Sequence, residues 1–334
     1  MNDAGPAPRE VMRARRPRRP SSIRMPSRWL KMLDLPLFLM ACGLIAGVSL
    51  TPPPVGCALG RACGLLLYHL NTRRRRQAHD NLRMVFGRSM PASRQRRLVK
   101  QVFMHLGQTF FETVYARWLL QPRSFRRYVC VHNVGALRAA AREGRGIVCV
   151  TGHVGNWEIC GLTTGLLGFP LHSLYRPVGG RFLDLLTRWL RERHGQRLVP
   201  AQEGVARLIA VLRAGGYVGL VADQYARGSD LCVQFFGLPS ATSAIVGLLA
   251  FRTGAPVVCG YAIRRGSSFA YDFYILPPLP RGTTGNLRQD LVDLTQAYMN
   301  SVETFARRFP GQYIWTHRRW RGADLEHAAR LNLP

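Results

Sequence analysis

Short apolar runs recur through the middle of the chain, and each is bounded by glycine, proline or polar residues. Runs of this length, rich in β-branched and aromatic residues, are typical of buried strands. The last two runs are separated by the polar stretch 264–268, which predicts a hairpin. The predicted strands are residues 147–150, 171–175, 217–222, 256–263 and 270–276.

Before, between and after these runs, apolar residues repeat at the three- and four-residue spacing of an amphipathic helix. The pattern is clearest at residues 99–114 and 287–305, and shorter versions cover residues 182–189 and 205–212. Strands that alternate with helices in this way predict an α/β fold, with a mixed sheet flanked by helices.

The N-terminal region has a different pattern. Residues 1–33 are rich in Arg, Pro and Ser without periodicity, which predicts a basic disordered tail. No charged residue occurs in residues 35–60, and residues 34–71 are expected to anchor the chain in a membrane. Two forms stay open: a transmembrane helix with its basic end in the cytoplasm, or a helical hairpin embedded in the membrane surface. A cleaved signal peptide is disfavoured because the apolar run begins late.

Composition adds a strong positive charge. The 334 residues carry a formal net charge of +29, nearly all of it from arginine, because lysine occurs only as Lys31 and Lys100. Anionic membranes, acidic carrier proteins and nucleic acids attract such a chain. The sequence contains no zinc-finger spacing and no RNA-binding aromatic motif, so nucleic acid is not expected as a partner.

The cysteines are scattered, and no pair has Cys-x-x-Cys spacing. Several lie inside apolar runs, which predicts small buried side chains in a reducing compartment. The eight cysteines are Cys42, Cys57, Cys63, Cys130, Cys149, Cys160, Cys232 and Cys259.

One apolar run leads directly into candidate catalytic residues. Residues 146–158 read Gly-Ile-Val-Cys-Val-Thr-Gly-His-Val-Gly-Asn-Trp-Glu. The glycines around His153 predict a tight turn, and Asn156 is a good N-cap for a helix that begins at Trp157. Glu158, in the first helical turn, is expected to contact one imidazole nitrogen while the other nitrogen faces a substrate.

A histidine with such a carboxylate forms a base and its orienting group. His153 would remove the proton of a hydroxyl near neutral pH, and Glu158 would stabilise the imidazolium, as in a Ser-His-Asp triad whose serine is replaced by the substrate. From these two residues alone, a purely structural histidine stays open. Metal binding is disfavoured, because the motif is not His-Glu-x-x-His and no second histidine lies nearby in the sequence. Neither a metal nor a cofactor is therefore expected in the reaction.

The string Thr-Gly-His-Val-Gly-Asn-Trp-Glu closely resembles the His-x4-Asp/Glu block of the lysophospholipid acyltransferase superfamily, in particular its lipid A late acyltransferase (lauroyl/myristoyl) branch. The resemblance extends over residues 73–320 and includes residues 76–86, which are similar to an Arg-x4-Asn-Leu-x3-Phe segment of the family. It implies a glycerolipid acyltransferase-like α/β fold, with an acyltransferase domain at residues 72–322 and a C-terminal tail at residues 323–334.

The resemblance also implies substrate-binding residues outside this block. A Tyr-Arg-Pro segment would place Arg176 near the reacting carbonyl, although Val-Gly-Gly follows here where the family often has asparagine. Asp223 and Gln224 match an Asp-Gln pair at a strand end beside the active site. Phe235 and Phe236 resemble the family's Phe-Phe-Gly segment, and either an acyl pocket or ordinary core stays open for them.

The last block is similar to the terminal Trp-x-His-Arg-Arg-Phe/Trp signature of the family. His317, Arg318 and Arg319 are expected to bind anionic lipid groups, with Trp315 and Trp320 at the membrane interface.

Together these features predict a membrane-bound O-acyltransferase of lipopolysaccharide biosynthesis, on the cytoplasmic side of the bacterial inner membrane. Its donor would be a fatty acyl thioester of acyl carrier protein or coenzyme A, and its acceptor a hydroxyl of a lipid A precursor or a similar anionic glycolipid. Three alternatives stay open: another glycolipid or a lysophospholipid as acceptor, thioester hydrolysis, and a basic membrane-binding protein without turnover. The last does not need His153 and Glu158.

Overall fold

A mixed sheet lies at the centre of the computed structural model, which describes residues 28–175, 177, 180–201, 204–226, 231–282 and 284–320. Within these ranges seven strands form the sheet in the order β1-β9-β8-β2-β5-β3-β4. Neighbouring strands are parallel except β8 and β9, which form the predicted antiparallel hairpin. The strands are β1 (Val129–His132), β2 (Ile147–Thr151), β3 (Leu171–Tyr175), β4 (Arg197–Pro200), β5 (Tyr217–Val221), β8 (Val257–Arg264) and β9 (Tyr271–Ile275).

Helices cover both faces of this sheet, because alternate strand residues point to opposite sides. In β2, Val148 and Val150 belong to a core shared with α8, α9 and α10, whereas Ile147 belongs to a second core shared with α5 and α6. A separate hairpin joins β6 (Cys232–Phe235) and β7 (Leu238–Ala241). The helices are α5 (Val134–Arg142), α6 (Trp157–Leu166), α7 (Arg181–Arg191), α8 (Gly204–Arg213), α9 (Ile245–Thr253) and α10 (Leu287–Arg308).

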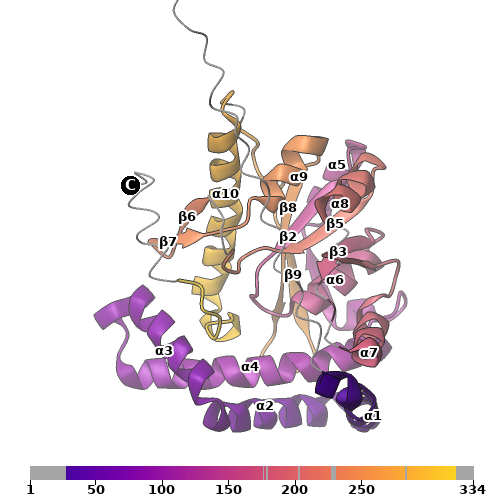
Figure 1. Cartoon of the computed structure of the whole chain (residues 1–334), viewed down its shortest axis with the longest axis vertical. Coiled ribbons are helices and arrows are strands. Elements are labelled where there is room, and N and C mark those ends of the chain that lie inside the picture. The colour runs from indigo at the N-terminus through magenta and orange to yellow at the C-terminus, as the bar shows by residue number, and fades with distance from the viewer. Residues whose placement is uncertain are drawn as a thin grey trace, which may run out of the picture.

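The N-terminal helices form a platform below the sheet. They are α1 (Arg28–Leu50), α2 (Pro53–Leu70), α3 (Thr72–Phe86) and α4 (Ala92–Leu119). Figure 1 shows α2 lying along α4 beneath the sheet, with α1 at one end. The helices α2 and α4 touch at their backbones: a Cβ on Gly64 would lie 2.2 Å from the Phe103 carbonyl oxygen, and one on Gly107 would lie 2.3 Å from that of Gly60. Only glycine permits this close crossing.

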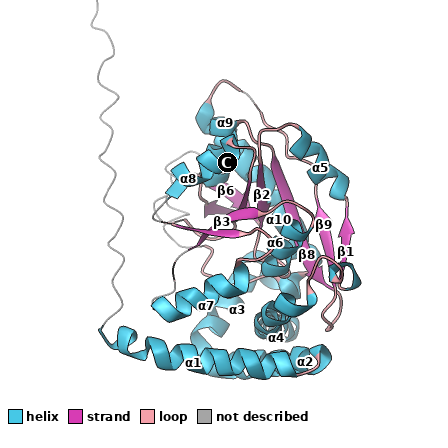
Figure 2. Cartoon of the chain, turned by 90° about the vertical axis from the view of Figure 1, so that its right-hand side faces the viewer, coloured by secondary structure: helices cyan, strands magenta, loops and turns pink. Residues whose placement is uncertain are grey.

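Asp34, the acidic residue of α1, connects this helix to α7. Asp34 accepts hydrogen bonds from the backbone N–H groups of Phe182 and Leu183, so it caps the positive end of α7. Phe38 packs against Phe182 with ring centroids 5.6 Å apart. Figure 2 shows α1 and α2 following each other along the lower edge of the molecule. Among the described helices, none combines the length and the apolar character needed to cross a membrane.

The predicted strands all form, with ends within one residue of those expected, and the four predicted helices correspond to α4, α7, α8 and α10. The expectation of buried cysteines is correct for Cys57 and Cys160, among others, but wrong for Cys63 and Cys130, which are exposed. In the edge strand β1, Cys130 points away from the core that its neighbour Val129 enters.

A buried ion pair connects α4, β8 and the loop after β2. Arg264 and Glu112 are only 5% and 0% exposed, and the guanidinium also donates to His105 Nδ1 over 2.7 Å. His105 Nε2 then donates to the carbonyl oxygen of Gly155 over 3.1 Å. Burial, assisted by the Arg264 charge, lowers the pKa of His105 well below its usual value, so the ring is neutral as this pattern requires. Asn156 Nδ2 donates to Glu112 over 3.1 Å, which ties a second loop residue to the pair.

Because this pair is buried, removing one charge should be costly. We expect Glu112→Gln to lower the free energy of unfolding by about 3–5 kcal/mol, since Arg264 then stays buried without a counter-charge. Denaturant unfolding of the purified full-length protein in detergent would measure the change.

The matched control is Glu143→Gln, which breaks the exposed pair with Arg145 and should cost about 1 kcal/mol or less. Equal effects of the two substitutions would show that the buried pair does not hold the fold.

Candidate active site

Two neighbouring parallel strands bring His153 and Asp223 together. The strands β2 and β5 are in register, with Thr151 beside Val221 at their carboxyl ends. The same offset, continued into the loops that follow, places His153 beside Asp223. The carboxyl ends of parallel strands are where α/β sheets commonly bind ligands.

Asp223 holds His153 through two hydrogen bonds. His153 Nδ1 lies 2.6 Å from Asp223 Oδ1, and the His153 backbone N–H donates to Oδ2 over 2.9 Å. His153 Nε2 lies 3.1 Å from the amide nitrogen of Gln224, which can only donate. The hydrogen-bond pattern therefore assigns the proton of the neutral ring to Nδ1 and a lone pair to Nε2.

Asp223 is ionised and nearly inaccessible to solvent. Its side chain is 1% exposed, and burial by itself raises its pKa. The His153 ring, the two hydrogen bonds from His153 and the charge of Arg319 outweigh burial and lower the pKa of Asp223 below its usual value. A carboxylate at Nδ1 stabilises the imidazolium that forms when Nε2 takes a proton, so His153 and Asp223 can act as a general base and its orienting group.

The expected contact between Glu158 and His153 is wrong. The Glu158 carboxylate accepts hydrogen bonds from Trp157 Nε1 at 3.1 Å and from Arg191 Nε at 2.8 Å. Its place in the first turn of α6 directs it towards α7, and Asp223 already occupies the imidazole Nδ1. Glu158 therefore holds Arg191 rather than the base.

The turn that carries His153 is braced by its neighbours. Asn156 caps α6 as predicted, accepting from two backbone N–H groups of the first helical turn. Gly155 has a φ of 66°, and a Cβ there would lie 2.1 Å from the carbonyl oxygen of Ala262, so glycine is required. The Gly155 N–H donates to the carbonyl oxygen of Gln312 over 2.9 Å.

A cavity of about 1230 Å³ begins at His153 and extends between the sheet and α6. Near His153 its wall is polar, and it includes Glu158, Arg191, Gln224 and His317. A cavity that is polar at one end and apolar at the other suits an amphipathic ligand. The apolar lining residues contributed by α5, α6, β8 and β9 are Leu137, Leu162, Val258, Phe273 and Ile275.

The three basic residues of the last block have different environments. His317 lines the cavity, and burial chiefly lowers the pKa of His317 to about 4, so its ring is neutral near pH 7. Arg318 is exposed. Arg319 is 1% exposed and donates to the Ala241 carbonyl oxygen and to Thr242 Oγ1. The expectation that Arg319 binds lipid at the surface is wrong, because its guanidinium holds the end of β7.

The aromatic residues near the C-terminus form core rather than pocket or interface. Phe235 and Phe236 are buried against Tyr313, Trp315 and Trp320, and neither lines the cavity. Of the two possibilities for the phenylalanines, ordinary core is confirmed. Trp315 and Trp320 are also buried, so their predicted position at a membrane interface is wrong.

Arg176 lies outside the described residues. Sequence reasoning also missed Arg191, which the structure places in the cavity wall next to Glu158. No spacing distinguishes Arg191 from the rest of the 47 basic residues, and its neighbours in α7 follow an ordinary amphipathic pattern.

Comparison with known proteins identifies the family of the chain. A family model described as bacterial lipid A biosynthesis acyltransferase matches residues 17–322. The chain is 28% identical over 299 residues to the lipid A biosynthesis lauroyltransferase of Escherichia coli (strain K12), covering 89% of this chain and 92% of that protein. It is 26% identical over 273 residues to the palmitoleoyltransferase of the same organism, covering 81% and 86%.

A more distant similarity is to the phosphatidylinositol mannoside acyltransferase of Mycobacterium tuberculosis (strain CDC 1551 / Oshkosh), 27% identical over 210 residues and covering 59% of this chain and 61% of that protein. The family match spans the His153 loop, the Asp223 loop and the buried C-terminal block alike. The chain therefore belongs to the bacterial lipid A biosynthesis acyltransferase family and is an acyltransferase.

Proposed function

We propose that this enzyme moves a fatty acyl group from the thioester of acyl carrier protein to a hydroxyl of a lipid A precursor, at the surface of a membrane. The observation that carries the proposal is the His153–Asp223 pair at the polar end of a cavity whose other end is apolar. Family membership supports acyl transfer to lipid A.

In the proposed reaction His153 acts first as a base and then as an acid. Nε2 takes the proton of the acceptor hydroxyl, whose oxygen attacks the thioester carbonyl, while Asp223 stabilises the imidazolium. The tetrahedral intermediate then expels the carrier thiolate, which receives the proton from Nε2. The products are an ester and a free thiol. To reach Nε2, the hydroxyl must take the place from which Gln224 now donates.

The cavity fits the two parts of the donor. Its apolar end, lined by Leu162 and Phe273 among others, would hold the acyl chain out of water. At its polar end, Arg191 and the neutral His317 can donate hydrogen bonds to the polar part of a substrate. The net charge of +29 favours an acidic carrier protein as the source of the thioester.

Apolar side chains beside this polar end support a membrane location. In α1, Leu39, Met40 and Leu44 are exposed, and in α7 so are Leu185 and Trp189. The helix α7 packs on α1 and also contributes to the cavity wall. Exposed apolar surface of this kind marks contact with a membrane or a partner. A lipid acceptor could therefore enter the cavity from the membrane surface.

The mycobacterial relative favours one alternative acceptor. Because that protein acts on a phosphatidylinositol mannoside, an acceptor other than lipid A remains a second candidate for the same site. The chemistry at His153 would be unchanged.

An assay of the full-length enzyme in mixed micelles tests the function. Acyl carrier protein and coenzyme A thioesters would each be combined with a lipid A precursor, a lysophospholipid or water alone, and the ester and thiol products quantified. We expect ester only with the lipid A precursor, faster from the carrier protein, and His153→Ala should lose about 10²- to 10⁴-fold in rate. Full activity of His153→Ala, or ester only from the lysophospholipid, would contradict the proposal.

A second comparison separates the roles of the two carboxylates. We expect Asp223→Asn to lower kcat by about 10²- to 10⁴-fold, because an amide at Nδ1 favours the wrong tautomer and does not stabilise the imidazolium. Glu158→Gln should affect mainly KM, since it weakens the hold on Arg191 without touching the base. If Glu158→Gln reduced kcat as much as Asp223→Asn, the assignment of Asp223 as the sole orienting carboxylate would have to be abandoned.

A third prediction concerns the membrane surface. We expect the triple variant Leu39→Gln, Met40→Gln and Leu44→Gln to lose most salt-resistant binding to phospholipid vesicles, because apolar contacts are not screened by salt. The control variant Arg73→Gln/Arg76→Gln should lose only the electrostatic part of vesicle binding, which high salt also removes. Vesicle co-sedimentation at low and high salt measures both, and unchanged sedimentation of the triple variant would place the membrane contact elsewhere.

A further inference from the structure

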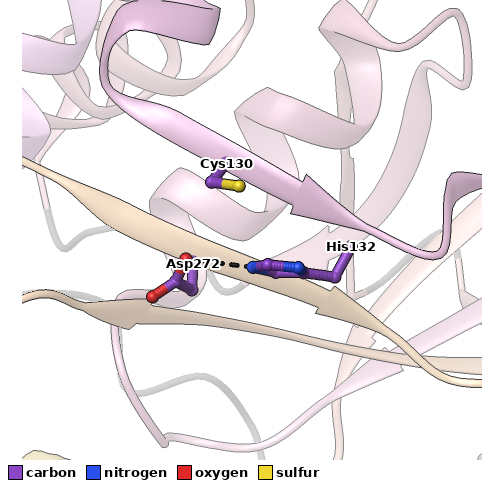
Figure 3. Close-up of side chains that lie close together, drawn as sticks. All are labelled: Cys130, His132 and Asp272. Carbon is purple, nitrogen blue, oxygen red and sulfur yellow. Dashed lines mark hydrogen bonds and ion pairs between the residues drawn. The ribbon is translucent and has the colours of Figure 1, made fainter.

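The open edge of the sheet carries side chains that can bind a metal and that the reaction does not use. The edge strand β1 runs parallel to β9, with Cys130 beside Asp272 and His132 beside Tyr274. Alternate residues of a strand share a face, so Cys130, His132 and Asp272 project together while Phe273 enters the core on the other side. Figure 3 shows the three side chains gathered between the two strands.

The distances between these side chains are close to those of a metal site. His132 Nε2 lies 3.0 Å from Asp272 Oδ1, and the ligand atoms of all three residues lie within 4.8 Å of one another. The His132 ring stacks on Tyr274 with centroids 4.8 Å apart and planes at 15°, which restricts its orientation. In the part of the chain that the structure describes, no other group of His, Cys, Asp and Glu has this spacing.

The set of donor atoms selects the kind of ion. A thiolate sulfur, an imidazole nitrogen and a carboxylate oxygen suit zinc, whereas magnesium and calcium prefer oxygen alone. Bonds of about 2.0–2.3 Å to a tetrahedral zinc ion place neighbouring ligand atoms about 3.3–3.6 Å apart. The ligand atoms, which lie within 4.8 Å of one another, must come closer by roughly 1 Å to bind zinc in this way, and the exposure of Cys130 leaves the fourth position to water.

We propose that Cys130, His132 and Asp272 form a binding site for a divalent transition-metal ion, zinc foremost, at the edge of the sheet. The thiolate and the carboxylate supply negative charge that balances the ion, and binding releases the thiol proton to solvent. The ion joins β1 to β9 by bonds between side chains, in addition to the backbone hydrogen bonds of the pair.

This site differs from the catalytic centre and does not depend on the proposed reaction. The expectation that no metal takes part concerned His153, which follows β2, whereas this cluster lies on β1 and β9 at the sheet edge, and β8 separates these strands from β2. The two regions share one wall: Phe273 and Ile275 of β9 line the apolar end of the cavity on the opposite face of the strand. An ion that fixes β9 to β1 therefore stiffens the far wall of the cavity.

Titration of the full-length protein with Co²⁺ tests the site after chelator treatment and dialysis. A thiolate bound to Co²⁺ gives a charge-transfer absorption band that neither imidazole nor carboxylate produces, and Zn²⁺ should abolish that band by competition. We expect Cys130→Ser to remove the band, and His132→Ala and Asp272→Asn to weaken Co²⁺ and Zn²⁺ binding by at least about tenfold. The control is Cys63→Ser, which removes the other exposed cysteine and should bind as the wild type does.

Thermal unfolding gives a readout that does not depend on the spectrum. Zn²⁺ that binds only the folded state should raise the Tm of the wild type and of Cys63→Ser, and leave that of Cys130→Ser unchanged. Cys63 and Cys130 are exposed, and His132 and Asp272 are partly exposed, so the variants should fold. A charge-transfer band that persists in Cys130→Ser, or equal Zn²⁺ affinity in the wild type and the three variants, would overturn the proposal.

Discussion

The buried pair of Arg264 and Glu112 is the constraint on which the position of the loop that carries His153 depends. Charges in a protein interior are tolerated only when their hydrogen bonds are complete, and here the loop after β2 helps to complete them. The Asn156 amide reaches the carboxylate directly, and the Gly155 carbonyl reaches the guanidinium through His105. If the loop moved, Glu112 and His105 would each lose a hydrogen-bond partner in the protein interior, which is energetically costly.

A second constraint, the register of the parallel strands, then brings His153 and Asp223, the two groups proposed for catalysis, together. The strand before His153 and the strand before Asp223 were both predicted from their apolar runs, together with the helix N-cap at Asn156. What spacing along the chain could not show was that these strands are neighbours. Local helix geometry favoured Glu158 as the partner of His153, whereas the sheet supplied Asp223 from far along the sequence. Catalytic contacts between separate strands require the strand order, which periodicity does not contain.

Burial was the other property that the sequence could not reveal. Arg318 and Arg319 are adjacent and chemically identical, yet the first is exposed and the second is enclosed by the end of β7. The edge strands β1 and β4 and the strands β6 and β7 were not predicted, because each is only four residues long and its apolar pattern is too short to identify a strand. By contrast, the long helices and the central strands were predicted well, because their apolar faces repeat over many residues or form unbroken runs. The apolar run at residues 35–60 predicted helices correctly, but not the glycine contacts that pack α2 on α4.

The position of Gln224 has a consequence for side reactions. Its amide donates to the lone pair of His153 Nε2, so the proposed base already has a hydrogen-bond partner. A water molecule that displaced the amide would exchange one hydrogen bond for another and gain little. A lipid hydroxyl arrives with the binding energy of the whole molecule, which can be used to move the amide aside. The enzyme would thereby keep a loaded thioester from being wasted on water until the correct acceptor is in place.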